Sequence, residues 1–193
     1  MADNIGLIAF LGNPGRQYQR NRHNVGMLFC DAIPEFSRLT WKSGFKGVWS
    51  SFDTQSTKIY CIKPGTFMNL SGESVREIAQ YFHIPKESIL VVHDELELAF
   101  GTIGLKFGGG LGGHNGLRSM NQCFQGPDFW RLRFGIGRPD HSDVAAYVLS
   151  NFSEEESRLL AEKVFPGAIP LIAPILRGDA PVCDKTTAKV KTL

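Results

Sequence analysis

The stretch LGNPGRQYQRNRHNVG, residues 11–26, decides how the rest of the chain is interpreted. It follows an apolar run at 5–11 that is typical of a β-strand, and it begins with the turn-forming residues Gly12 to Gly15. A phenol, two guanidinium groups, an imidazole and an amide come next, from Tyr18, Arg20, Arg22, His23 and Asn24. Ligands bind beyond the carboxyl ends of strands in open α/β sheets, so a functional site is expected here. A polar loop in which Asn24 caps a helix is the alternative.

Around this stretch, short apolar strands alternate with amphipathic helices. The periodicity predicts strands at 5–11, 47–52, 58–63, 88–93, 102–107 and 131–137, and helices at 25–36, 71–82, 115–124, 143–149 and 153–164. The run at 88–93 is continuously apolar, which is typical of a strand buried on both faces. The pattern predicts an α/β fold, a single domain over residues 1–180 with a twisted, mixed and mostly parallel sheet flanked by helices on both faces.

The C-terminal region departs from this pattern. Pro166, Pro170 and Pro174 recur in an apolar stretch, and proline inside a helix removes a hydrogen bond, so a kinked or broken helix is expected. Residues 181–193 include three lysines without apolar periodicity, and they are expected to form a mobile basic tail.

Composition narrows the class of protein. With 42% hydrophobic and 21% charged residues, the chain has the composition of a globular protein, and no apolar run approaches the roughly 20 residues of a membrane helix. The N-terminus lacks the features of a signal peptide, which predicts a cytoplasmic location. The four cysteines lie far apart without a CxxC pair, so reduced thiols are expected. A net charge of +2 indicates nucleic-acid binding only if basic side chains gather on one face.

Three further stretches carry polar chemistry. KPGTFMNLSG, residues 63–72, places Met68 and Asn69 at a strand-to-helix junction, where Asn69 or Ser71 could equally cap the helix. HDEL, residues 93–96, ends a buried strand in Asp94, and a buried carboxylate requires a partner, either His23 or a cation. GGGLGGHNGL, residues 108–117, is a glycine-rich loop before a helix, suited to close approach of a ligand or simply flexible.

Several common catalytic motifs are missing. Phe10 stands where a dinucleotide fingerprint needs its first glycine, and the sequence contains no GxxxxGK[ST], GxSxG or HExxH. An imidazole, a carboxylate and several amides remain. This set suits hydrolysis by a directly activated water, because histidine as a residue type titrates near neutral pH, a carboxylate can fix its tautomer, and amide N–H groups can support an oxyanion.

The motifs FLGNPGRQYQRNRHNVG, KPGTFMNLSG, HDELEL and GGGLGGHNGL, in this order, resemble those of the bacterial-type peptidyl-tRNA hydrolases. The resemblance covers residues 5–150. It implies a monomeric α/β enzyme that cleaves the ester between a peptide and the terminal ribose of tRNA, without a metal ion or other cofactor. The implied partner is the acceptor end of peptidyl-tRNA, with no membrane and no obligate protein partner.

Carried over position by position, the resemblance makes His23 the general base and Asp94 the carboxylate that orients it. It implies that Asn13, Asn69 and Asn115 hold water and substrate around the ester, and that Tyr18 and Met68 line the cleft. Lys106 and Arg133 match positions associated with tRNA phosphates. Gly104 departs from the pattern, since the family usually has Arg or Lys there. The implied phosphate clamp is therefore one charge short, and Arg118 or another neighbour would have to complete it.

Two alternatives stay open. A non-catalytic RNA-binding relative would share the fold, although the joint presence of the site residues favours an enzyme. A metal-dependent hydrolase could use His23, His93, Asp94 and His114, but their spacing matches no common metal motif.

Overall fold

Eight strands form one twisted sheet in the computed structural model, which describes residues 4–140, 143–182 and 188–191. The strand order is β2-β3-β4-β1-β5-β7-β6-β8. The four central strands, β4, β1, β5 and β7, run parallel, and the outer pairs are antiparallel. The predicted mixed sheet with a parallel core is confirmed. The strands are β1 (Leu7–Phe10), β2 (Lys42–Gly44), β3 (Gly47–Asp53), β4 (Lys58–Pro64), β5 (Ile89–Glu95), β6 (Thr102–Phe107), β7 (Trp130–Gly135) and β8 (Ala188–Lys191).

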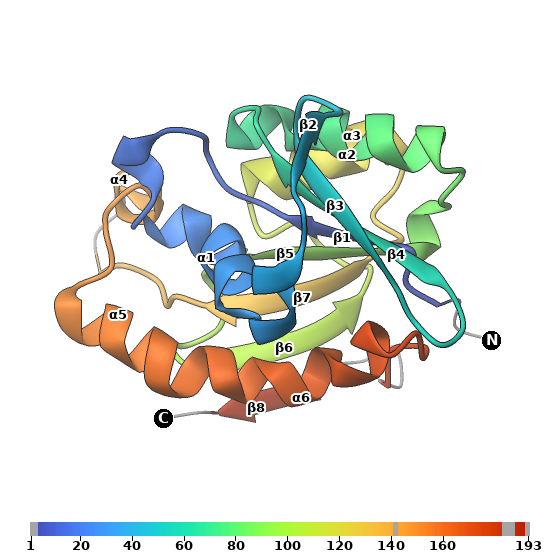
Figure 1. Cartoon of the computed structure of the whole chain (residues 1–193). Coiled ribbons are helices and arrows are strands. Elements are labelled where there is room, and N and C mark those ends of the chain that lie inside the picture. The colour runs from blue at the N-terminus through green and yellow to red at the C-terminus, as the bar shows by residue number, and fades with distance from the viewer. Residues whose placement is uncertain (1–3, 141–142, 183–187, 192–193) are drawn as a thin grey trace.

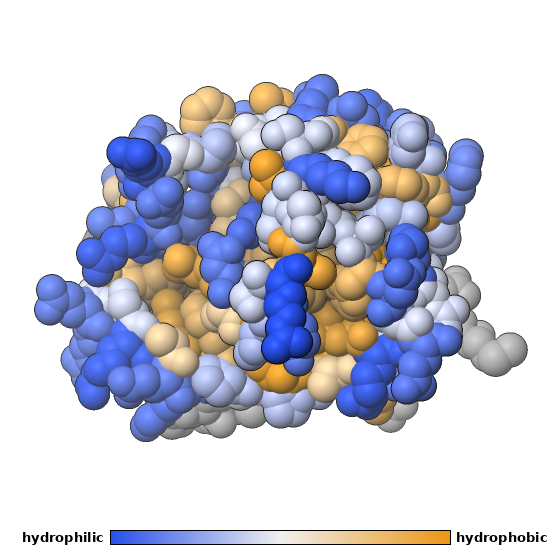
Figure 2. Space-filling model, viewed as in Figure 1, coloured by the Kyte–Doolittle hydropathy of each residue, from blue (hydrophilic) through white to orange (hydrophobic). Residues whose placement is uncertain are grey.

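Helices cover both faces of the sheet, as predicted (Figure 1). Alternate strand residues point to opposite faces, so each strand contributes to two hydrophobic clusters. Ile8 and Phe10 pack with α1 (Val25–Ala32) and α6 (Phe165–Leu176), whereas Leu7 and Ala9 pack with α2 (Ser71–Tyr81) and α3 (Asn115–Phe124). In the same view, Figure 2 shows mostly hydrophilic surface, with hydrophobic groups exposed between α1 and α6.

The topology opens a crevice at one end of the parallel strands. β1 and β4 are neighbours, but the connection after β1 leads to α1 on one face, and the connection after β4 leads to α2 on the other. A crevice forms where adjacent parallel strands send their connections to opposite faces. The motif that begins at Leu11 and the motif that contains Met68 both lie at this point.

The C-terminal helix is continuous, so of the two expected outcomes the break is wrong, whereas the kink stays a prediction. α5 (Glu154–Leu159), a π-helical turn (Leu160–Val164) and α6 form one helix from Glu154 to Leu176. Pro166 and Pro170 lie four residues apart on the exposed side of this helix. The carbonyl that each proline leaves without a donor belongs to the residue four positions earlier, on the same side. Water can therefore satisfy those carbonyls, and the helix continues.

This helix is also long and apolar enough to cross a membrane by length and composition, with a mean hydropathy of 1.6 over its apolar window. So long an apolar helix was not predicted from the sequence. Core helices meet the same criterion, and here the inward side chains Phe165, Ala168, Ile172 and Ile175 are buried against the sheet. The inward side of the helix therefore belongs to the core, and 33% of its apolar window is buried.

Other differences lie at element ends. The expected side-chain caps from Asn24, Asn69 and Ser71 are not formed, because each of these residues is itself in a 3-10 or α-helical turn. α4 (Val144–Val148) is shorter than expected. β2 and β8 were not predicted from sequence; β8 lies within the expected tail, where its short Ala-Lys-Val-Lys run pairs with the edge strand β6. The mobility of residues 181–193 stays a prediction, and residues 183–187 and 192–193 lie outside the described part.

Candidate active site

His23 lies in a 3-10 turn, Arg22–Asn24, immediately before α1, and it is held close to the end of β5. A glycine makes this approach possible. A Cβ atom at Gly26 would lie 2.5 Å from the carbonyl oxygen of Val92 and 2.8 Å from that of Leu11, so the first turn of α1 packs directly on the strand backbones. Nδ1 of His23 is 2.8 Å from Oδ1 of Asp94, the penultimate residue of β5. The predicted pairing of these two side chains is confirmed.

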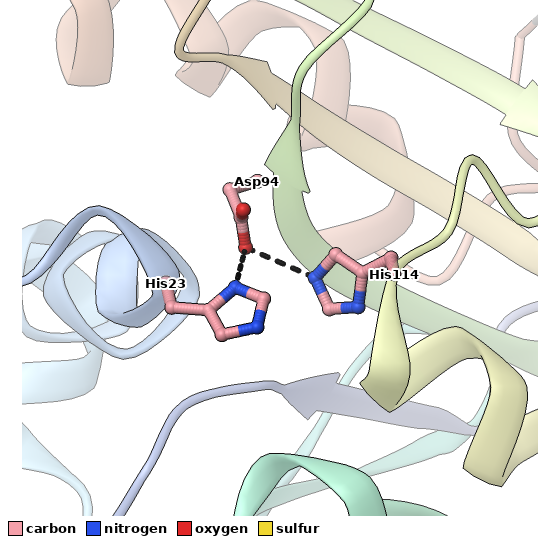
Figure 3. Close-up of side chains that lie close together, drawn as sticks. All are labelled: His23, Asp94 and His114. Carbon is pink, nitrogen blue, oxygen red and sulfur yellow. Dashed lines mark hydrogen bonds and ion pairs between the residues drawn. The ribbon is translucent and has the colours of Figure 1, made fainter. Parts of the chain in front are cut away.

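A second imidazole meets the same carboxylate oxygen (Figure 3). Nε2 of His114 is 2.9 Å from Oδ1 of Asp94. Nδ1 of His114 accepts hydrogen bonds from the backbone N–H groups of Gly116 and Leu117, and His114 thereby caps α3. Because Nδ1 is an acceptor, the ring proton lies on Nε2 and is donated to Asp94. The tautomer of His114 is fixed by the helix end.

These contacts keep Asp94 ionised although it is 2% exposed. Burial alone would raise the pKa of Asp94, but electrostatic attraction by the imidazole groups of His23 and His114, and their hydrogen bonds, outweigh it and hold the pKa well below its usual range. His93, the preceding residue, is buried on the other face of β5, and burial holds its pKa well below the ordinary value, with a further lowering from His114. His93 is therefore a neutral residue of the sheet.

Asn13 is fixed by the carboxamide of Asn24. The N–H of Asn13 donates to Oδ1 of Asn24, and Nδ2 of Asn24 donates to the carbonyl of Asn13, both at 2.9 Å. Oδ1 of Asn13 accepts the backbone N–H of Met68 at 2.7 Å. The oxygen of the Asn13 amide is thus committed to the β4–α2 connection, so its Nδ2 donor is left for the crevice. Asn24 was interpreted from sequence as a possible helix cap, and its side chain instead holds the backbone of Asn13 in place.

Two cavities meet at His23 and Asn115. The first, the Tyr18 cavity, has a volume of about 310 Å³ and is lined by the sequence-predicted residues Asn13, Tyr18, His23, Met68, Asn69 and Asn115, together with Phe67, Ala145, Val148 and Leu149. The second, the His114 cavity, has a volume of about 510 Å³ and contains Asp94, His114 and Arg118 in its wall. The structure therefore brings all of the predicted catalytic and cleft residues together around one imidazole.

The predicted phosphate-binding residues lie in two different places. Arg118 lies in the His114 cavity, where its Nη1 is 3.4 Å from Oδ1 of Asn115. Lys106 and Arg133 line neither cavity and lie on β6 and β7. They share one face of the sheet, since Ile103, Leu105, Leu132 and Phe134 occupy the face covered by α1 and α6. Binding of phosphate by these three residues stays a prediction.

A metal ion is the alternative use of this cluster. Ligand atoms of His23, Asp94 and His114 lie within 4.8 Å of one another, and His93 is not part of that group. The ring nitrogens that face Asp94 are, however, hydrogen-bonded to it, and His114 carries its proton there. A metal ion would have to displace both hydrogen bonds. The donor set fits a hydrogen-bonded triad better than a ligand set.

From the sequence, His114 was interpreted only as a metal ligand, and the contacts of Arg22 were not predicted. Nη2 of Arg22 donates to both carboxylate oxygens of Glu156, at 2.8 and 2.9 Å, and Nη1 donates to Oγ of Ser150 at 2.9 Å. The guanidinium also stacks 4.6 Å from the ring centroid of Tyr147. The position of Arg22 beside His23 was the one signal in the sequence for this role. Its partners, Ser150 and Glu156, lie more than 120 positions away in the chain.

Comparisons with known proteins agree with this geometry. The family model described as peptidyl-tRNA hydrolase matches residues 7–192. A peptidyl-tRNA hydrolase of Gluconobacter oxydans is 46% identical over 84% of this chain and 88% of that protein, and one of Geotalea daltonii is 42% identical over 92% and 93%. The crystal structure of peptidyl-tRNA hydrolase from Acinetobacter baumannii superposes with a TM-score of 0.80 at 36% identity, over 92% of this chain and 90% of that one. The chain belongs to the peptidyl-tRNA hydrolase family of enzymes.

Proposed function

We propose that the protein hydrolyses the ester bond between a peptide, or an N-blocked aminoacyl group, and the terminal ribose of tRNA, releasing free tRNA and peptide. Water activated by His23 is the nucleophile, and no metal ion is required. The observation that carries the mechanism is the hydrogen bond of His23 Nδ1 to a buried, ionised Asp94, at the point where the two cavities meet.

The chemistry follows from the tautomer of His23. Nδ1–H donates to Asp94, so the Nε2 lone pair, which points away from Asp94 in Figure 3, can take a proton from water. The water oxygen then attacks the ester carbonyl, and the resulting oxyanion is stabilised by amide donors. As the intermediate collapses, the ribose oxygen leaves and takes the proton back from Nε2. Asp94 stabilises the imidazolium in between.

Three amides suit the oxyanion and the peptide. Nδ2 of Asn13 is free to donate because its Oδ1 is occupied by Met68. Asn69 and Asn115 are exposed and line the Tyr18 cavity, where Met68 and Tyr18 supply apolar contact for the substrate. We infer that Asn115, shared by both cavities, positions the attacking water beside His23.

Hydrolysis of N-acetyl-aminoacyl-tRNA and of the same aminoacyl-tRNA with a free amino group tests this function. We expect release of free tRNA from the blocked substrate and sparing of the unblocked one, with the rate unchanged by a chelator. Binding of tRNA without release would instead indicate the non-catalytic RNA-binding alternative. Loss of activity with a chelator and its return with Zn²⁺ would contradict the metal-free mechanism.

We also propose that the protein acts as a monomer in the cytoplasm without an obligate protein partner. The side chains of both hydrophobic clusters are buried within one chain, which supports a fold that needs no second subunit. Sedimentation equilibrium of the purified protein, with and without tRNA, tests the oligomeric state.

A further inference from the structure

Arg22 joins the turn before α1 to the segment that follows α4. Its Nη1 donates to Oγ of Ser150 at 2.9 Å and to the carbonyl oxygen of Asn151. Backbone hydrogen bonds run alongside, from the N–H of Arg22 to the carbonyl of Ser150 and from the N–H of Phe152 to the carbonyl of Arg20, both at 3.0 Å. The two segments are therefore paired through both side chain and main chain, and Figure 1 shows α4 next to the connection between β1 and α1.

α4 depends on contacts with its surroundings. It has five residues, too few for a helix to be stable by its own hydrogen bonds. Val148 is buried in the core, and the guanidinium of Arg22 stacks on the ring of Tyr147. Oγ of Ser150, which accepts from Arg22, donates in turn to the carbonyl of Tyr147 at the end of the helix. Arg22 therefore holds both α4 and the residues directly after it.

α4 forms part of the wall of both cavities. Ala145 and Val148 line the Tyr18 cavity and the His114 cavity, and Leu149 lines the Tyr18 cavity. All three side chains are apolar, so this wall suits an apolar group of a ligand. In a peptidyl ester, the apolar group closest to the reacting carbonyl is the side chain of the esterified amino acid. The position of α4 should therefore decide how well that side chain is bound.

We propose that Arg22 is a positioning residue that sets the preference of the enzyme for an apolar side chain on the esterified amino acid, because it fixes the α4 wall beside His23. This proposal rests on the proposed function, since an acyl ester is what places such a side chain in the Tyr18 cavity. Arg22 itself lines neither cavity and acts through Val148 and Leu149. The competing explanation is that Arg22 only balances the charge of Glu156 and stabilises the fold.

Two substrates that differ only in this side chain separate the explanations. We would measure kcat/KM of the full-length protein for N-acetyl-phenylalanyl and N-acetyl-glycyl esters of the same tRNA, and we expect the wild type to favour the phenylalanyl ester. Lysine at position 22 keeps a charge beside Glu156 but has no planar group that reaches Glu156, Ser150 and Asn151 together. In Arg22→Lys, the preference should fall about tenfold, the effect of losing roughly one methylene of pocket contact, through a higher KM for the phenylalanyl ester. A disturbed His23 would instead lower kcat for both esters and leave their ratio unchanged.

Ser150 supplies a second variant at an exposed position, where substitution is tolerated. Ser150→Ala removes an acceptor of Nη1 and should lower the preference, whereas Ser150→Thr keeps the hydroxyl and should keep the preference of the wild type. Glu156→Gln is the matched control for stability. It weakens the ion pair with Arg22 but leaves the contacts of Nη1 with Ser150 and Asn151, so it should also keep the preference.

Amide hydrogen exchange over residues 144–152 reports on the wall directly. Exchange should be faster in Arg22→Lys and Ser150→Ala than in the wild type, and unchanged in Glu156→Gln. A wild type without the preference, a preference within about twofold of the wild type in both Arg22→Lys and Ser150→Ala, or equal losses of preference in Ser150→Ala and Glu156→Gln would overturn the proposal. Absence of hydrolysis of both esters by the wild-type protein would instead overturn the proposed function, whatever the exchange rates.

Discussion

Asp94 offers a single carboxylate oxygen to two imidazole rings, those of His23 and His114. Taking a carboxylate out of water costs several kcal/mol, and two N–H donors directed at one oxygen offset that cost. The need for a partner of Asp94 was predictable from sequence, because a carboxylate ends an apolar strand. The contribution of His114 was not, because it depends on the glycine-rich loop folding back so that the start of α3 faces the end of β5.

His93 supplies a prediction about stability and pH. Its pKa is held below the ordinary value in the folded protein, so the unfolded chain binds a proton that the folded one does not. The stability contributed by neutral His93 is therefore complete above about pH 6.5 and is lost as pH falls towards the depressed pKa, by up to about 1.4 kcal/mol per pH unit. We expect His93→Asn, which keeps a donor near the Nδ1 position, to flatten this dependence.

Urea unfolding of the wild type and the variant between pH 5 and pH 7.5 measures the effect. His83→Asn is the matched control, because His83 is exposed and its φ of 55° is one that Asn tolerates. The control should keep the wild-type pH slope. An identical slope in His93→Asn and the wild type would contradict the assignment of a buried neutral imidazole.

Among the secondary-structure elements, α4 and α5 are tied to the turn that carries His23. Val148 of α4 lies in the wall of both cavities, and α5 begins with a capping box formed by Ser153 and Glu156. Glu156 also holds the Arg22 guanidinium, next to His23. One carboxylate thus links the start of α5 to the turn that carries His23. The sequence predicted the helix that begins here, but a long-range ion pair has no local sequence pattern.

Glu156→Gln tests this link. Losing the charged hydrogen bonds to Arg22 should lower the free energy of unfolding by about 2 kcal/mol, because a partly buried guanidinium then lacks its counter-ion. Glu155→Gln, which removes a charge from the same helical turn at an exposed position, should change it by less than about 0.5 kcal/mol. Chemical denaturation measures both variants. Equal losses of unfolding free energy in the two variants would mean that the helix dipole, and not the ion pair with Arg22, is responsible.

At the scale of the whole molecule, the order of strands and helices was predictable because alternating periodicities identify a parallel core. The position of the crevice also followed, since the motifs after β1, β4 and β5 converge at one end of that core. Two features depended on tertiary structure. The prolines of α6 are tolerated because Pro166 and Pro170 face outwards, and β8 forms because β6 would otherwise present an unpaired edge. Neither reason can be read from local sequence.

The proposed mechanism separates chemistry at His23 from phosphate binding at Lys106. Single-turnover hydrolysis of N-acetyl-aminoacyl-tRNA, measured together with the Kd for tRNA, tests it most directly. His23→Ala should reduce the rate at saturating enzyme by at least about 100-fold, the lower end of general-base contributions, and leave Kd within about twofold of the wild type. Lys106→Ala should do the reverse, weakening tRNA binding and keeping the saturated rate. A His23→Ala variant that retains more than a few per cent of the rate, or one that loses tRNA affinity as much as Lys106→Ala does, would contradict the account.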